Sequence, residues 1–143
     1  MRLLVIAPSG AVAAALDSLQ IRSDDHVDVV TATSCDAQGS SVAQIELGPS
    51  ALPSRGRMAT ALQRSVIGRN ILRLTPLDGG RRFAKAARRN RDFQTSTAEA
   101  DLIVALERDG ILTAWKALRA SARPGVRGVH GLAPARALLA AGR

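Results

Sequence analysis

Three side chains with catalytic potential, Ser9, Asp109 and His130, each follow a short apolar run of the sequence. A serine nucleophile needs a base within hydrogen-bonding distance and a third group that orients this base, so the three residues would suit a hydrolase. However, the sequence has no G-x-S-x-G motif, and Asp109 stands where an aspartate would cap a helix. A hydrolase is therefore not the favoured interpretation, and Asp109 and His130 are kept as weak catalytic candidates.

The turn Pro8-Ser9-Gly10 precedes a predicted helix and could bind an anion. Backbone N–H groups at the start of a helix can donate to a phosphate or a carboxylate. The turn lacks the G-x-G-x-x-G and P-loop patterns, which disfavours NAD and P-loop enzymes, and such a turn is often only a helix cap. A small flavodoxin-like enzyme that uses Ser9 and Asp109 stays open as a further hypothesis. The candidate ligand-binding residues are Ser9, Gly10, Glu107, Asp109, His130 and Gly131.

The sequence offers little for metal or redox chemistry. Its single cysteine, Cys35, excludes an internal disulfide and a site built from several thiolates. Cys35 has no basic neighbour that would lower its pKa, so we expect an inert thiol. The two histidines, His26 and His130, are too few for a typical zinc site without carboxylate ligands. We expect neither a metal nor a cofactor.

The candidate residues must be positioned by strands and helices that alternate along the chain. Continuous apolar runs are typical of strands that are buried on both faces, and the alternating run 42–47 indicates an edge strand. We expect strands at 3–7, 26–33, 42–47, 101–106 and 126–129, and helices at 11–19, after Asp109, and at 132–141. This order predicts one open parallel sheet of the Rossmann-like kind, with strand order 3-2-1-4-5 and flanking helices.

Ligands of open parallel sheets bind outside the carboxyl ends of the strands, where the strand order reverses. The predicted order puts this crevice between the first and fourth strands. Ser9 and Gly10 would lie on one side of it and Glu107 and Asp109 on the other, with His130 after the fifth strand. Trp115 shares helical spacing with Ile111 and Leu118, so we expect it in the core.

A basic segment at 55–91 carries most of the positive charge. It holds ten arginines and one lysine but only one acid, Asp78, in a chain of net charge +8. We expect two amphipathic helices here, one around 58–66 and one opened by Asp78-Gly79-Gly80, with a narrow stripe of Phe83, Ala86, Ala87 and Asn90. The residues expected to bind an anionic surface are Arg57, Arg64, Arg81, Arg82, Lys85, Arg88 and Arg89.

This segment has three open interpretations: a solvated helical face, an anionic membrane surface as partner, or nucleic acid as partner. The interleaved apolar residues favour contact with a membrane or a partner protein over nucleic acid, and the chain has only 2% aromatic residues on which bases could stack. We expect a single domain over 1–143. Pro8-Ser9-Gly10 interrupts the first apolar run, so we interpret this run as a strand and not as a signal peptide. We therefore expect a cytoplasmic protein. It would be peripheral to the membrane if the basic segment binds one.

Two stretches resemble the N-terminal domain of a GT-B glycosyltransferase of the family-4-like kind. The first is residues 1–10, a strand followed by a small-residue loop. The second is the succession of Ala100-Asp101 with an apolar run, an apolar helix, and the strand 126–129 ending in His130-Gly131. Together they cover nearly the whole chain in outline, although each motif is short.

The resemblance implies a domain that binds the acceptor, with Ser9, Gly10 and His130 near an interdomain cleft. Such enzymes bind the sugar nucleotide mainly through a second, C-terminal Rossmann domain, for which we expect no room in these 143 residues. We therefore do not expect glycosyl transfer by this chain alone. The favoured hypothesis is a glycosyltransferase-like acceptor-side domain that acts with a partner chain supplying the nucleotide-sugar domain, or that serves as a binding module. The alternative is a basic Rossmann-like interaction domain.

Overall fold

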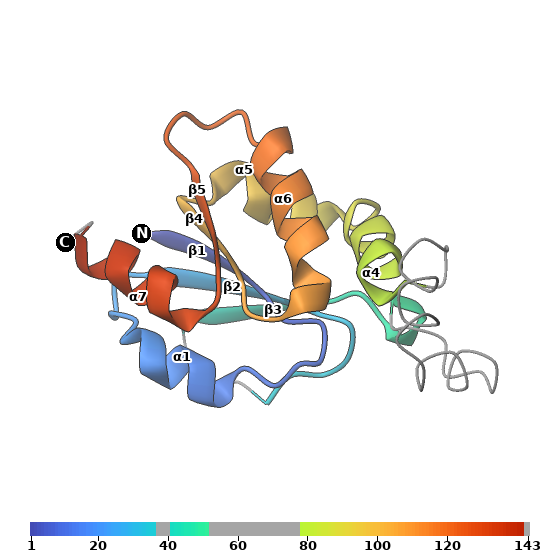
Figure 1. Ribbon diagram of the computed structural model, residues 1–143, viewed down its shortest axis with the longest axis horizontal. Helices are drawn as coiled ribbons and strands as arrows, with labels where there is room; N and C mark the ends of the chain where they lie inside the picture. Colours follow the sequence, from blue (N-terminus) through green and yellow to red (C-terminus); the bar gives the residue numbers. More distant parts are fainter. Residues whose placement is uncertain (37–40, 52–77, 142–143) are drawn as a thin grey trace, which may run out of the picture.

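The protein forms an α/β sandwich around one parallel sheet (Figure 1). The structure is a computed structural model that describes residues 1–36, 41–51 and 78–141. Its five strands are β1 (Arg2–Ile6), β2 (His26–Thr31), β3 (Val42–Glu46), β4 (Leu102–Ala105) and β5 (Arg127–His130). All neighbouring strands are parallel and their order is β3-β2-β1-β4-β5. The predicted fold class and strand order are both confirmed.

The central strands are apolar on both faces because helices cover both faces of the sheet. Leu4 and Ile6 of β1 belong to one core cluster, whereas Leu3 and Val5 belong to the other. This division follows the alternation of side chains along a strand. β3 and β5 are the two edge strands, and within β3 only Ile45 is buried, as its alternating sequence predicts.

Two helices cover one face of the sheet. They are α1 (Ala13–Leu19) and α7 (Leu132–Ala141), which lie side by side (Figure 1). Leu16 and Leu19 of α1 and Leu139 of α7 are buried against this face. The predicted bounds of α7 are confirmed, whereas α1 begins two residues later than the predicted Ala11.

Three helices cover the other face: α4 (Gly79–Ala87), α5 (Arg91–Glu99) and α6 (Ile111–Ala120). Two short 3-10 helices, η1 (Pro49–Ala51) and η2 (Arg108–Gly110), lie next to α4. Asp78 caps α4 by accepting from the Arg81 N–H at 3.1 Å, as its position predicts. The predicted helix at 58–66, with Arg57 and Arg64, lies outside the described residues.

Three expectations for this face are wrong. Asn90 does not continue the apolar stripe of α4, because it caps the separate helix α5 by accepting from the Phe93 N–H at 2.9 Å. Asp109 does not cap α6, because η2 intervenes and Gly110 takes the cap position. Trp115 is 51% exposed, since α6 turns Thr113, Ala114 and Ala117 toward the sheet instead.

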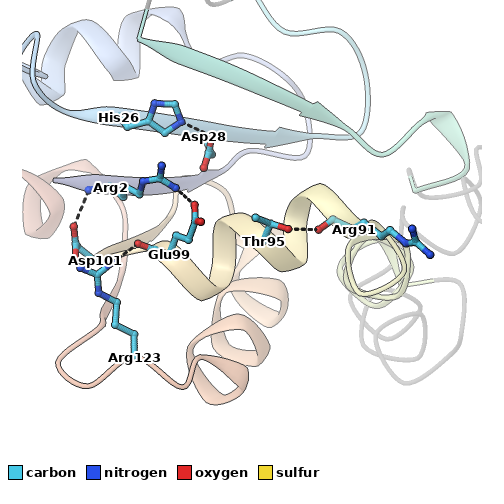
Figure 2. Close-up of polar contacts among 8 residues, drawn as sticks. All are labelled: Arg2, His26, Asp28, Arg91, Thr95, Glu99, Asp101 and Arg123. Carbon is cyan, nitrogen blue, oxygen red and sulfur yellow. Dashed lines mark hydrogen bonds and ion pairs between the residues drawn. The ribbon is translucent and has the colours of Figure 1, made fainter.

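Hydrogen bonds and ion pairs of charged side chains connect the amino ends of β1 and β4 (Figure 2). The backbone N–H of Arg2 donates to Asp101 at 2.8 Å, and its guanidinium pairs with Glu99. Arg123 reaches Asp101 at 2.7 Å and the carbonyl oxygen of Glu99 at 2.6 Å. His26 and Asp28 of β2 make a separate pair, with Nε2 and Oδ1 3.2 Å apart. The charged side chains at the amino ends of β1 and β4 are therefore paired with one another, and a small pocket of about 230 Å³ lies beside Asp101 and Arg123.

Phe83 is the largest fully buried side chain among the residues that the structure describes, and it packs α4 against the sheet. Phe83→Ala should lower the free energy of unfolding by about 3–5 kcal/mol, because it removes buried apolar surface and leaves a cavity. Urea denaturation measures the difference. Lys85→Ala, on the exposed side of the same helix, is the matched control and should stay within about 0.5 kcal/mol of the parent protein. Equal losses in the two variants would contradict this packing.

Candidate functional site

The loops after β1 and β4 meet at the carboxyl edge of the sheet. β1 and β4 are paired in register from Leu3 with Leu102 to Ile6 with Ala105, so both strands end at the same level. Beyond them, the backbone N–H of Ser9 donates to the two carboxylate oxygens of Glu107 at 3.1 and 3.3 Å, and the Ser9 hydroxyl also donates to this carboxylate. Two of the predicted site residues, Ser9 and Glu107, are therefore hydrogen-bonded to each other between the loops after β1 and β4, where the strand order reverses.

The first N–H groups of α1 are also bonded to side chains of the protein. Asp36 Oδ1 accepts from Val12 at 2.9 Å and from Ala13 at 3.0 Å, and the Ser9 hydroxyl oxygen accepts from Ala11 at 3.2 Å. These hydrogen bonds hold the pKa of Asp36 below its ordinary value. The carboxylate of Asp36 thus stands where a bound phosphate would be expected. Sequence reasoning missed Asp36, because its hydrogen-bond partners lie more than twenty positions away along the chain.

Gly10 is required by the packing of this loop. Its φ is +83°, and a Cβ atom would lie 2.8 Å from the carbonyl oxygen of Ser34. Both facts exclude a side chain at this position without a shift of the backbone. A glycine at position 10 therefore allows the loops after β1 and β2 to pack closely. This packing explains the glycine, and no ligand is needed to explain it.

His130 lies at the same edge but apart from Ser9. It ends β5 and is exposed, and it pairs in register with Ala105 of β4. β4 therefore separates it from β1. Gly131 follows with φ of +88° and turns the chain into α7. No hydrogen bond or ion pair within the described part of the chain joins Ser9, Asp109 and His130, so these residues do not form a hydrogen-bonded triad here.

Asp109 lies on η2, beside the start of α4. A Cβ atom on Gly80 would lie 3.1 Å from the carbonyl oxygen of Asp109, so the glycine allows η2 to approach α4 closely. Partial removal from water raises the pKa of the Asp109 carboxyl above its ordinary value, and the negative charges of Asp78 and Glu107 add to this effect. The Arg108 charge opposes the rise but does not reverse it.

An open groove of about 620 Å³ lies next to Asp109. We call it the rim groove. Trp115 forms part of its wall, and the guanidinium of Arg119 lies 5.0 Å from the centre of the indole ring, which is within cation–π distance. Ile111, which is 40% exposed, also lines it. The lining residues are Asp78, Gly80, Arg108, Asp109, Ile111, Leu112 and Trp115.

The rim groove combines an apolar wall with two carboxylates. Exposed large apolar side chains beside polar groups are typical of a binding surface. Sequence reasoning found Asp109 as a candidate but missed Asp78 and Trp115. The sequence signals were an expected helix start for Asp78 and helical spacing for Trp115, and neither gives information about the approach of the two residues in space.

A group of basic side chains lies on α4 and on the two residues that follow it. Arg81, Lys85, Arg88 and Arg89 are exposed, whereas Arg82 is half-buried. None of the ion pairs between residues that the structure describes involves them.

Residues 1–36, 41–51 and 78–141 contain no group of three or more side chains that could hold a metal ion. None of the helices in these ranges is long and apolar enough to cross a membrane. No protein-family model, curated protein or solved structure matches this chain.

The raised pKa of Asp109 predicts how the stability of the protein depends on pH. Because folding disfavours the ionised carboxyl, stability should be greatest while Asp109 is protonated and should fall as pH rises through the raised pKa. Asp109→Asn removes this loss, so the variant should be more stable than the parent at about pH 7 but not at about pH 3.

Urea denaturation across this range measures the difference. Asp24→Asn replaces an exposed aspartate and is the control, which should leave the pH dependence unchanged. A constant difference between Asp109→Asn and the parent at every pH would contradict the assignment.

Proposed function

We propose that this chain is a glycosyltransferase-like acceptor-side domain that binds a neutral saccharide in the rim groove. The observation that carries the proposal is the exposed indole of Trp115 in one groove with the carboxylates of Asp78 and Asp109. The groove begins next to the carboxyl end of β4, where open parallel sheets bind their ligands. The link to glycosyltransferases is one of resemblance and fold analogy.

The chemistry of the groove suits a sugar better than an anion. The apolar face of a sugar ring can cover the indole of Trp115 and so remove apolar surface of both groups from water. Sugar hydroxyls can donate hydrogen bonds to the carboxylates of Asp78 and Asp109. The two carboxylates outnumber the one cation that lines the groove, Arg108, so the groove favours a neutral ligand over an anion. A raised pKa also suits Asp109 to accept the proton of an acceptor hydroxyl as that oxygen bonds to the anomeric carbon of the donor sugar. The bond from this carbon to the phosphate oxygen of the nucleotide would break, and the nucleoside diphosphate would leave on the partner chain.

The loop after β1 supports what the resemblance implies, namely that this domain binds the acceptor and a second domain binds the nucleotide sugar. Its N–H groups at Ser9, Val12 and Ala13 donate to Glu107 and Asp36. A nucleotide phosphate would have to displace these carboxylates. We therefore propose that a partner chain binds the nucleotide sugar, and that the donor sugar reaches the rim groove from that partner.

Trp115 makes the proposal directly testable, because it is the only tryptophan of the chain. Titration with chitotriose and with maltotriose should produce a saturable change in intrinsic fluorescence for at least one of them. Asp109→Asn should weaken the binding about tenfold, as expected for the loss of a hydrogen bond to a charged group. Asp92→Asn, on the exposed side of α5, is the control and should bind like the parent.

Calorimetry extends this test to Trp115→Ala, which has no fluorescence signal, and this variant should lose binding. Absence of a saturable response to either saccharide, or binding that survives Trp115→Ala, would contradict the proposal.

The exposed cations of α4 support a second candidate function, the binding of an anionic membrane surface. Vesicles that contain phosphatidylserine should bind the protein, and the affinity should fall steeply with salt. The combined change of Arg81, Arg82, Arg88 and Arg89 to serine should abolish this binding. A triple variant at exposed positions outside α4, with Arg22, Arg127 and Arg136 changed to serine, is the control and should retain most of it.

Vesicle sedimentation measures this binding, and a gel shift with DNA separates a membrane partner from nucleic acid. Unchanged vesicle binding in the quadruple variant would contradict this function, and a shift of DNA without vesicle binding would assign the cations to nucleic acid.

A further inference from the structure

A second pocket lies between α4, α5 and α6 and has a volume of about 350 Å³. We call it the three-helix pocket. It shares no lining residue with the rim groove. Its size falls at the lower end of the range of about 300–1,000 Å³ for small-molecule sites. The lining residues are Ala84, Arg88, Phe93, Gln94, Thr97, Ala98, Thr113, Lys116, Ala117 and Ala120.

Most of the wall of the three-helix pocket is apolar. Ala84 of α4 and Ala117 of α6 are buried, and Phe93 of α5 is only 6% exposed. α4 and α5 both pack against α6, yet the alanines are too short to fill the space between the three helices. Protein interiors are normally close-packed, so a hollow of this size beside the core is a feature to be explained.

Two buried hydroxyls in the wall have no hydrogen-bond partner. Thr97 of α5 and Thr113 of α6 are 6% and 2% exposed, and the structure shows no partner for either Oγ1 atom among the residues it describes. A threonine in a helix can donate to the carbonyl four residues before it, as Thr95 does to Arg91 at 3.2 Å (Figure 2). The two buried threonines do not do so, although leaving a buried hydroxyl unpaired costs free energy.

Two cations line the same pocket, and no acid does. Arg88 and Lys116 are both exposed, and neither takes part in an ion pair with another described residue. Thr113 and Lys116 are three residues apart on α6, so they are neighbours on one face of the helix. The hydroxyl of Thr113 and the ammonium of Lys116 can therefore act on the same ligand group.

We infer that the three-helix pocket binds a small carboxylic acid with an apolar body. The body would cover Ala84, Phe93 and Ala117, while Arg88 and Lys116 would pair with the carboxylate. Thr97 and Thr113 would donate their hydroxyl hydrogens to its oxygens. The ligand thereby supplies the acceptors that the buried hydroxyls lack, and it fills the hollow left by the alanines. Such an acid would bind independently of any saccharide in the rim groove.

Octanoate is a suitable probe, and isothermal titration calorimetry on the full chain measures its binding. One molecule should bind per chain. The double variant Thr97→Val and Thr113→Val keeps the shape of both side chains but removes the hydroxyls, so it should bind octanoate at least about tenfold more weakly. The same variant without ligand should melt at a higher temperature than the parent, because it no longer buries unpaired hydroxyls.

The charged side chains need a separate arm. Arg88→Gln combined with Lys116→Gln should weaken octanoate binding by about tenfold or more, but should leave the weaker binding of octanol unchanged. Asp92→Asn serves as the control outside the pocket and should change neither affinity.

Three results would overturn the inference: absence of octanoate binding, equal affinity for octanol and octanoate in the parent, or full octanoate affinity in the double valine variant. Binding only to vesicles of phosphatidylserine, with none to free octanoate, would assign Arg88 and Lys116 to a membrane surface and would also overturn it. Because the saccharide test reads Trp115 and this test reads octanoate, the failure of one leaves the other intact.

Discussion

The parallel pairing of β1 with β4 is the constraint on which the rest of the structure depends. Both strands are buried on both faces, so their register is fixed, and their carboxyl ends stop at one level. The chain after β1 and the chain after β4 must therefore meet. Glu107 joins them by accepting from the backbone and the hydroxyl of Ser9. At the amino ends of the same two strands, Asp101 forms an ion pair with Arg123 and accepts a hydrogen bond from the backbone of Arg2.

This constraint also determines where a ligand can bind. In open parallel sheets the reversal of strand order is the usual ligand site. Here the carboxylates of Glu107 and Asp36 already accept hydrogen bonds from the N–H groups that would otherwise bind an anion. The open space lies to the side, over η2 and the starts of α4 and α6, where Asp109 and Trp115 line the rim groove. This arrangement supports the proposal that the rim groove takes a neutral ligand and that a partner chain binds the phosphate.

The sheet could be predicted well from the sequence, because a strand of a buried parallel sheet has a continuous run of apolar residues. Leu3 to Ala7 and Leu102 to Leu106 are such runs, and the order of strands and helices then favours one topology. α5 is missed because its nine residues are mostly polar, and Phe93 is its one large apolar side chain. Trp115 is misplaced because spacing shows which residues share a helical face, but it does not show which face meets the sheet. α6 buries the smaller side chains of Thr113, Ala114 and Ala117 instead.

Chemical-shift mapping of the backbone amides, with inorganic phosphate and then a nucleoside diphosphate as titrant, tests the central claim most directly. The claim is that the protein's own carboxylates fill the anion site at the reversal of strand order. The amide resonances of Ser9, Val12 and Ala13 should then stay in place throughout both titrations. A saturable shift of the Val12 and Ala13 amides at millimolar titrant would contradict it, because phosphate would then have displaced Asp36.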